Sequence, residues 1–165
     1  MKQHNKKSGF TVIEAVITTL AIVIIAAGVV TMASTWPAAE INLDVVSHQI
    51  MNDVRFVQSL AMSANTHCRI SFASTDYTIQ CYNYDASAWI TAQHPATPTS
   101  PIQLAGNVSF VTPTPACLAF NGAGTPYSCT IPGSALSSNT TIRLQSGTAI
   151  KNIGITTETG YAYLY

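Results

Sequence analysis

The pattern of hydrophobic and polar residues changes twice along the chain, and each change predicts a different structure. An apolar run comes first: no side chain from Ala15 to Ala39 carries a charge, over 25 residues. A helix rises about 1.5 Å per residue, so this run could cross a hydrocarbon core of about 30 Å. We therefore expect a membrane-spanning helix near the N-terminus.

From Ala38 to about Ala64 apolar residues recur every three or four positions, which predicts an amphipathic helix packed on a partner surface. Its apolar face comprises Leu43, Val46, Ile50, Val54, Val57 and Ala61. Five polar residues are expected to lie largely off that face: Asn42, Asp44, Ser47, Asp53 and Arg55. Asn65 is expected to end the helix. Pro37 either begins this helix or kinks a continuous one.

Beyond Asn65 the pattern alternates with a period of two. When the chain is folded at the four-residue turn 73–76, Phe72 faces Tyr77, Ile70 faces Ile79 and Cys68 faces Cys81. The apolar residues then share one face and the polar residues the other, which predicts a β-hairpin.

The rest of the chain predicts an irregular segment followed by short strands. Residues 83–101 hold three prolines, which indicates a surface excursion, with Trp89 and Ile90 as candidates to pack back on the sheet. Six strands are expected after it: Ile102–Leu104, Val108–Val111, Leu118–Phe120, Thr141–Leu144, Ile150–Ile155 and Tyr161–Leu164. The fold class is therefore α+β, a long N-terminal helix with an antiparallel β-sheet domain packed on its C-terminal half.

The four cysteines fall into two pairs with similar spacing, Cys68 with Cys81 and Cys117 with Cys129. Neither pair has the C-x-x-C spacing of a zinc or thioredoxin-like site. An even count at these spacings predicts two disulfides and an oxidising compartment, and four free buried thiols are the alternative. The hairpin places Cys68 opposite Cys81, at a distance compatible with bonding.

Charge is sparse and unevenly distributed. Charged residues make up 8% of the chain, which argues against a disordered chain. Lys2, Lys6 and Lys7 precede the apolar run, a bias that predicts a cytoplasmic N-terminus. From Phe10 onward four basic side chains stand against seven acidic ones, so the bulk of the chain does not have the charge of a nucleic-acid binder.

The segment KKSGFTVIE, from Lys6 to Glu14, leads directly into the apolar run. It resembles the type IV prepilin motif, in which basic residues, a glycine, an aromatic residue and a glutamate precede a span of about 20 apolar residues. A signal peptide would have a shorter apolar core and a cleavage site after it. A plain signal anchor fits the length but leaves the carboxylate of Glu14 unexplained, unless that group reaches for water at the interface.

The prepilin resemblance implies a specific processing and assembly route. A prepilin peptidase would cut between Gly9 and Phe10, and the new Phe10 amine would be N-methylated. Residues 1–9 would be the leader, 10–36 the transmembrane and filament-core helix, and 37–165 the periplasmic or extracellular domain. Glu14 would pair with the N-terminal amine of a neighbouring subunit. Many major pilins have a proline within this helix, whereas this chain has Gly28.

The C-terminal half carries a looser resemblance. LAFNGAGTPYS, from Leu118 to Ser128, and the last 25 residues are similar to minor pilins and minor pseudopilins of the GspH and FimT type. The segment Asp53–Ala61 also resembles the first helix of that family. The resemblance implies the pilin-like fold and weakens between residues 83 and 116.

No sequence motif for catalysis or for metal or cofactor binding is present. His48, His67 and His94 show no metal-ligand spacing, and FNGAGTP lacks the Lys-Ser/Thr of a phosphate-binding loop. We expect no enzyme and no cofactor. We expect a minor pilin or pseudopilin of a type IV pilus, including the mannose-sensitive haemagglutinin type, or of a type II secretion system.

The resemblance implies a prepilin peptidase, other pilins and the inner-membrane assembly platform as partners. The chain would span the inner membrane once, with its domain in the periplasm or on an extracellular pilus. Two alternatives stay open: a surface adhesin or DNA-binding tip pilin, and a signal-anchored periplasmic enzyme. Tyr161, Tyr163 and Tyr165 alternate and would share one face, suited to packing on neighbours or to base stacking.

Overall fold

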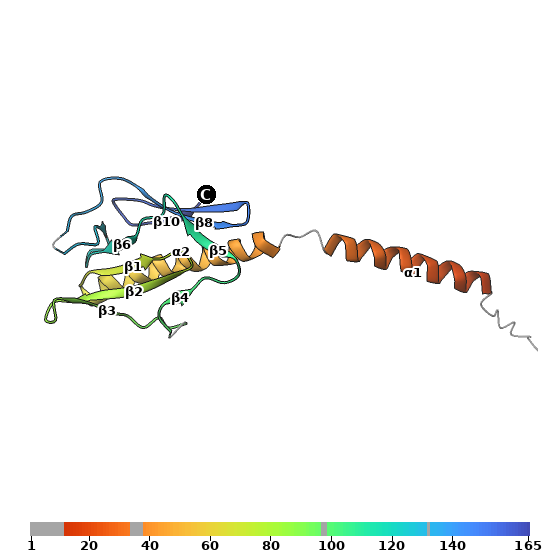
Figure 1. Ribbon diagram of the computed structural model, residues 1–165, viewed down its shortest axis with the longest axis horizontal. Coiled ribbons are helices and arrows are strands. Elements are labelled where there is room, and N and C mark those ends of the chain that lie inside the picture. The colour runs from red at the N-terminus through yellow and green to blue at the C-terminus, as the bar shows by residue number, and fades with distance from the viewer. Residues whose placement is uncertain (1–11, 34–37, 97–98, 132) are drawn as a thin grey trace, which may run out of the picture. The chain divides into compact units, whose positions relative to one another are not determined.

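A computed structural model describes residues 12–33, 38–96, 99–131 and 133–165 of the chain (Figure 1). The chain divides into two compact units, Met1–Pro37 and Ala38–Tyr165. The first unit contains helix α1 (Val12–Ala33), and the second contains helix α2 (Ala38–Ala64) and all ten strands.

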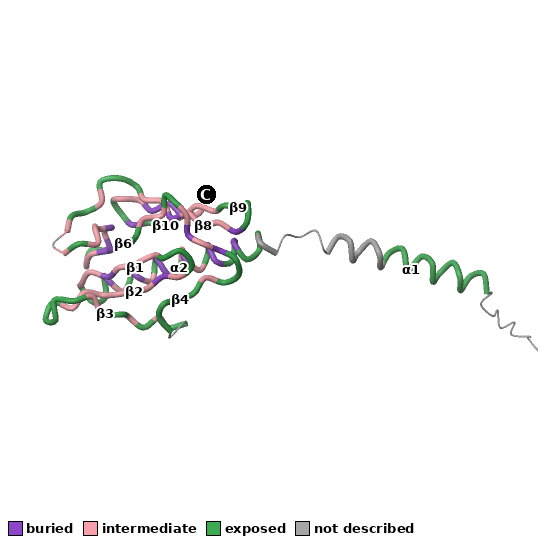
Figure 2. The backbone as a smooth tube through the Cα atoms, viewed as in Figure 1, coloured by how far each residue is buried: buried purple, intermediate pink, exposed green. Residues whose placement is uncertain are grey.

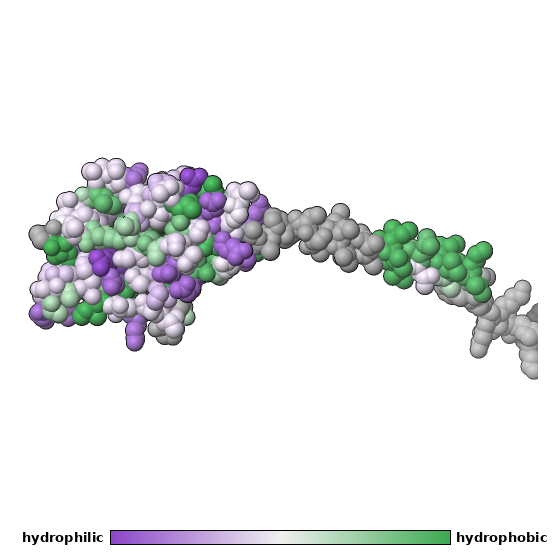
Figure 3. All heavy atoms as spheres, in the orientation of Figure 1, coloured by the Kyte–Doolittle hydropathy of each residue, from purple (hydrophilic) through white to green (hydrophobic). Residues whose placement is uncertain are grey.

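Helix α1 has apolar side chains on all sides of its described part. Every described side chain from Val12 to Ile25 is exposed, and Figure 3 shows the hydrophobic cover that they form. The hydroxyls of Thr18 and Thr19 donate to backbone carbonyls one turn earlier, at 2.9 Å and 2.7 Å, so these polar groups are satisfied within the helix.

Over the residues that the structure describes, neither helix combines the length with the hydropathy that crossing a membrane requires. The expected span 10–36 includes residues at both ends that lie outside the described ones, as does the Trp36–Pro37 joint. The span therefore stays a prediction.

Helix α2 has the predicted bounds, and its C-terminus explains why it stops at Ala64. Asn65 has a φ of 47°, in the left-handed region that asparagine tolerates. Its N–H donates to the carbonyl of Met62 and the N–H of Thr66 donates to the carbonyl of Ala61. This is the Schellman arrangement, which satisfies carbonyls that the ending helix leaves without a partner.

Six strands form the first sheet: β1 (Cys68–Phe72), β2 (Asp76–Asn83), β3 (Ala88–Thr91), β4 (Ile102–Gln103), β6 (Cys117–Phe120) and β7 (Pro126–Tyr127). Their order is β3-β2-β1-β6-β7, with β4 also paired to β2. The β1–β2 hairpin has the predicted register, with Phe72 opposite Tyr77.

Four strands form the second sheet: β5 (Val108–Val111), β8 (Thr140–Ser146), β9 (Ala149–Ile155) and β10 (Ala162–Leu164). Their order is β10-β9-β8-β5, and neighbouring strands are antiparallel. All six strands expected after residue 101 are present. One of them, Val108–Val111, matches its predicted bounds at both ends, and the other five differ by one or two residues.

Both sheets pack against α2 and share one hydrophobic core, visible as the buried segments of Figure 2. All six residues of the predicted apolar face of α2 are at most 1% exposed. They meet inward side chains of both sheets, among them Ile70, Phe120, Leu144 and Ile153. This confirms the predicted α+β architecture of a helix packed on antiparallel sheet.

Two expectations from the sequence need correction. Ser47 and Asp53 are buried, at 0% and 4% exposure, although their polarity placed them off the packed face. Residues 83–101 are more than an excursion, because Ala88–Thr91 forms strand β3 with Trp89 opposite Tyr82. The Gly-rich turn between Cys117 and Cys129 predicts a second disulfide-closed hairpin, and the structure has it as β6 and β7, although the two residues of β7 are too few to show a period.

Candidate functional site

The residues expected to matter for processing lie at the start of the first unit. Gly9 and Phe10 lie outside the described residues. Glu14 lies in the first turn of α1, and its side chain is exposed among apolar neighbours. A carboxylate on an apolar helix is costly to bury unless it finds a positively charged partner.

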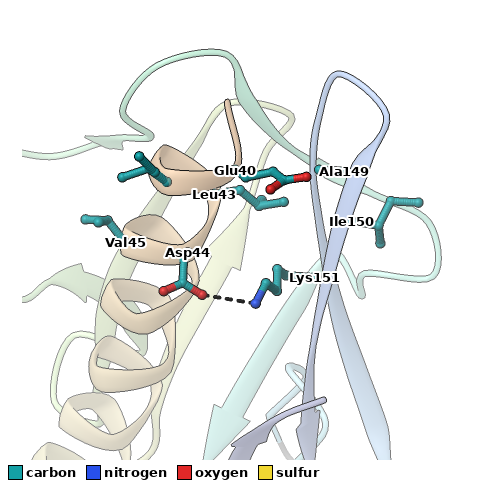
Figure 4. A pocket seen from close by; sticks show the side chains of 8 residues that line it. Glu40, Leu43, Asp44, Val45, Ala149, Ile150 and Lys151 are labelled. Carbon is teal, nitrogen blue, oxygen red and sulfur yellow. Dashed lines mark hydrogen bonds and ion pairs between the residues drawn. The ribbon is translucent and has the colours of Figure 1, made fainter. Parts of the chain in front are cut away.

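In the second unit an apolar groove lies between the first turns of α2 and the β8–β9 hairpin (Figure 4). Its volume is about 540 Å3. Ile41, Val45 and Ile150 line it and are 49%, 61% and 41% exposed. Figure 4 shows Glu40 and Leu43 between α2 and the hairpin, with Val45 and Ile150 directed outward on opposite sides. Exposed aliphatic side chains at the rim of a groove are typical of a protein–protein contact.

One ion pair lies at the side of this groove. Lys151 Nζ on β9 donates to Asp44 Oδ1 on α2 at 3.0 Å (Figure 4). His48 Nε2 lies 4.0 Å from Asp44 Oδ2. The hydrogen bond and the charge of Lys151 lower the pKa of the Asp44 carboxyl. Because both partners are about half exposed, the pair sets the geometry of the groove more than it stabilises the fold.

A buried polar network joins α2 to the loop that follows β3. Asp53 on α2 accepts a hydrogen bond from the Tyr77 hydroxyl, and His94 Nε2 lies 3.1 Å from the other carboxylate oxygen. Gln49 donates to the Tyr77 hydroxyl at 3.1 Å, and the Phe56 ring packs edge to face on His94. The network therefore fixes the proline-rich loop to the helix.

The pKa of the Tyr77 hydroxyl is raised in this network. Burial raises it well above its usual range, and the hydrogen bond and the negative charge of Asp53 raise it further. Tyr77 is therefore a neutral hydrogen-bond donor at physiological pH. These groups are satisfied by one another, which suits a structural role.

Two polar side chains of α2 donate hydrogen bonds to the β6–β7 turn and to the C-terminal segment of the chain. Gln58 Nε2 donates to the carbonyls of Gly124 and Thr159, at 2.8 Å and 2.7 Å. Arg55 donates to the carbonyl of Ala162 at 2.9 Å, and its guanidinium lies over the Tyr161 ring. Two turns distant in sequence are thus held on one helix face.

The cysteines form the two expected bonds, Cys68–Cys81 and Cys117–Cys129. Cys68 and Cys81 are opposite each other in the β1–β2 hairpin, with Cα atoms 4.0 Å apart. Cys117 and Cys129 flank the β6–β7 hairpin, and their Cα atoms are 6.4 Å apart. Each bond closes a hairpin that flanks the core.

In the part of the chain that the structure describes, no three His, Cys, Asp or Glu side chains come close enough to hold a metal ion. The three histidines after residue 40 instead contact different neighbours: His48 lies near Asp44, His67 bonds to Tyr84, and His94 bonds to Asp53.

The three C-terminal tyrosines share one face of the second sheet, as expected. Tyr161 stacks on Tyr163 with ring centroids 6.3 Å apart, and Tyr163 lies 5.7 Å from Tyr165. Tyr163 lies over Gly154 on β9, where a Cβ would meet the ring at 2.5 Å. The glycine leaves room for the ring to lie on the sheet.

Comparison with solved structures identifies one with the same architecture. It is the crystal structure of the type IV minor pilin FimU of Pseudomonas aeruginosa PAO1, matched over 78% of this chain and 92% of that chain, with a TM-score of 0.52 and 13% sequence identity. This chain has a pilin-like α+β fold. No family model and no curated protein matches the sequence.

Within this pilin-like fold, sequence reasoning found the helices, most strands and the cysteine pairs, but missed the groove and the Asp53 network. The groove combines residues more than 100 positions apart, such as Asp44 and Lys151. Tyr77 and His94 similarly lie 24 and 41 positions from Asp53, and a single sequence shows no signal for such pairing.

Proposed function

We propose that this chain is a minor pilin or minor pseudopilin, assembled into a type IV pilus or a type II secretion pseudopilus. The observation that carries the proposal is the pilin-like fold following a prepilin-type N-terminus. The fold resembles that of a type IV minor pilin. Lys6–Glu14 resembles the motif that prepilin peptidases recognise, which supports the proposal from a different part of the chain.

In this proposal the mechanism is assembly rather than catalysis. A prepilin peptidase cuts after Gly9 and exposes the amine of Phe10, which is then methylated. Residues 10–36 hold the subunit in the inner membrane and later pack in the filament core. The apolar surface of α1 suits both environments, because lipid tails and neighbouring apolar helices both exclude water.

Glu14 then has a defined role in subunit register. Its carboxylate pairs with the Phe10 amine of a neighbouring subunit, and this pair forms only after cleavage. In apolar surroundings an unpaired carboxylate is strongly disfavoured, so a subunit placed out of register is rejected.

The second unit supplies contacts to other minor subunits and to the inner-membrane assembly platform. The apolar groove is the surface that we assign to the contact with another pilin subunit. Its exposed aliphatic side chains gain stability when a partner covers them, by about 25 cal/mol per Å2 of apolar area removed from water.

Filament incorporation tests this function. The full chain is expressed in a bacterium with an active type IV pilus, and a second strain tests a type II secretion pseudopilus. The filaments are sheared and analysed for the chain. Glu14→Gln keeps the shape but removes the charge, and we expect it to reduce incorporation at least about tenfold, since an ion pair in apolar surroundings is lost.

Glu158→Gln is the matched control, because Glu158 is an exposed carboxylate in a turn of the second unit. It should be incorporated like the original chain. A chain absent from both filament types, or equal incorporation of Glu14→Gln and the original chain, would contradict the proposed assembly role.

A further inference from the structure

A row of aromatic rings crosses the face of the first sheet that points away from the core. Cys68 and Ile70 on β1 point into the core, so His67 and Arg69 point outward. Residues paired across neighbouring strands share a face, which places Tyr82 and its partner Trp89 there as well. Tyr127 joins them because it pairs with Ala119, which in turn pairs with Arg69.

Ring contacts are continuous from β3 to β7. Trp89 meets Tyr82 at 5.3 Å between centroids, and Tyr82 meets Tyr84 at 5.0 Å. His67 continues the row, 6.3 Å from Tyr84 and 5.2 Å from Tyr127. Each contact is edge to face, the arrangement that aromatic quadrupoles favour. We call these five residues the ring row.

The ring row is held in place but remains accessible. The guanidinium of Arg69 lies 4.1 Å from the centre of the Trp89 ring and donates to Gln80 at 2.9 Å, which orients the indole. His67 Nδ1 lies 2.7 Å from the Tyr84 hydroxyl. Tyr84 is 56% exposed, and the other four rings are half-buried. Fixed aromatic rings lose little conformational entropy when a ligand binds.

The charged side chains around the ring row limit the class of ligand that it can bind. Arg69, the cation beside the ring row, is already engaged by Trp89 and Gln80, and the exposed carboxylate of Asp85 follows Tyr84 directly. A nucleic acid needs clustered Lys and Arg to neutralise its phosphates, and the surroundings of the ring row do not supply them. The ligand that complements this face is uncharged, with apolar faces for the rings and hydroxyls for the polar tips.

We propose that the ring row binds a neutral oligosaccharide of β-linked hexopyranose units. Because neighbouring rings are inclined at 62–81° to one another, the C–H faces of β-linked pyranoses pack on those rings that present a face, while their equatorial hydroxyls reach the tyrosine hydroxyls. The row crosses five strands, or roughly 19 Å at the usual strand spacing, so it accommodates several linked units. This binding goes beyond the assembly function proposed above.

Trp89 provides a direct readout. The chain has two tryptophans, Trp36 and Trp89, so Trp36→Phe leaves Trp89 as the sole indole. The full chain carrying this change is purified in a zwitterionic detergent without a sugar headgroup and titrated with cellotetraose. We expect a saturable change in Trp89 emission. No change up to the solubility limit of the sugar would overturn the proposal.

Two exposed tyrosines on different sheets give a matched pair of variants. Tyr84 in the ring row and Tyr165 at the C-terminus are 56% and 61% exposed, so neither substitution is expected to unfold the chain. Tyr84→Ala should weaken cellotetraose binding by about tenfold, as expected for loss of one aromatic contact and a hydroxyl. Tyr165→Ala should leave the affinity unchanged, and equal weakening by both variants would contradict a site at the ring row.

Two further probes separate other ligand classes. Maltotetraose has the same glucose units in α linkage, which curves the chain, and it should bind more weakly than cellotetraose. A short oligothymidylate should leave Trp89 emission unchanged, and a stronger response to it than to cellotetraose would assign the face to nucleic acid. Filament incorporation of Tyr84→Ala is scored separately, so that a failure of sugar binding is distinguished from a failure of assembly.

Discussion

Asp53 shows how a polar side chain on a packed helix face is accommodated. It is 4% exposed, and both carboxylate oxygens have partners, the Tyr77 hydroxyl and the imidazole of His94. A buried carboxylate without partners would be costly, whereas this one ties a strand and a loop to α2. The helical period predicted the apolar face correctly but could not reveal that a distant tyrosine and histidine make this position compatible with burial.

Asp53→Ala should therefore destabilise the second unit. It leaves the Tyr77 hydroxyl and His94 without their shared partner, at a cost of about 3 kcal/mol in the free energy of unfolding. Urea denaturation of the full chain in detergent measures this change. Ser59→Ala, at an exposed position on the same helix, is the control and should cost less than about 0.5 kcal/mol. Equal effects of the two substitutions would contradict the role given to Asp53.

Tyr77 should produce a defined stability loss at alkaline pH. Its pKa is raised in the folded chain above its ordinary value of 10.0, so folding favours the protonated hydroxyl. The stabilisation is complete below pH 10 and is lost as pH rises, because the unfolded chain releases this proton first. Above pH 10 the original chain should lose about 1.4 kcal/mol per pH unit more than Tyr77→Phe does. Parallel curves for the two chains would contradict the assignment.

Strands were predictable from the sequence where apolar and polar residues alternate along them. They were less predictable where a strand is very short or pairs without such an alternating pattern. The β1–β2 register followed from six residues that match in pairs around one turn. Strand β3 was expected only as two residues packing back, because prolines and polar residues around it conceal its pairing with β2. The cysteines around a Gly-rich turn predicted the β6–β7 hairpin, but its register was not readable from so short a strand as β7.

The turns next to the strands give a test that separates backbone strain from packing. Gly147 and Gly160 have similar positive φ values, 60° and 67°. A Cβ at Gly147 would meet open space, whereas at Gly160 it would lie 2.8 Å from Phe120, a buried side chain. Gly147→Ala should cost about 1 kcal/mol for the left-handed backbone. Gly160→Ala should cost about 2 kcal/mol more because packing must also change.

Thermal or urea unfolding of both glycine variants measures this difference. Similar costs for the two substitutions would show that the 156–160 turn is not packed against Phe120 as described. Such a result would also remove support for the contacts that Gln58 makes to the two C-terminal loops.

At the scale of the whole molecule, the two units differ in how far their apolar side chains are buried. The second unit buries a large set of apolar residues in its own core and exposes others at its surface, such as Val45 and Ile90. The described part of α1 exposes such residues along its length, from 56% for Val16 to 83% for Val12. This contrast is readable from the sequence, because one segment lacks charge on all sides and the next is amphipathic.

The sequence also predicted the candidate site unevenly. Gly9, Phe10 and Glu14 follow from a local motif, so they were predicted without any tertiary information. The groove between α2 and β9, and the ring row across five strands, each combine residues distant along the chain. Their positions depend on strand order, which the alternating pattern does not specify.

In the proposed function, Gly9–Phe10 is a cleavage site whose product keeps the apolar helix. The most direct test is to express the full chain with and without a prepilin peptidase and to determine the N-terminus by mass spectrometry. We expect that the peptidase yields a chain starting at Phe10, methylated when the peptidase carries that activity, and that Gly9→Val blocks the cut. A chain that still begins at Met1 with an active peptidase, or one cut after the apolar run, would contradict it.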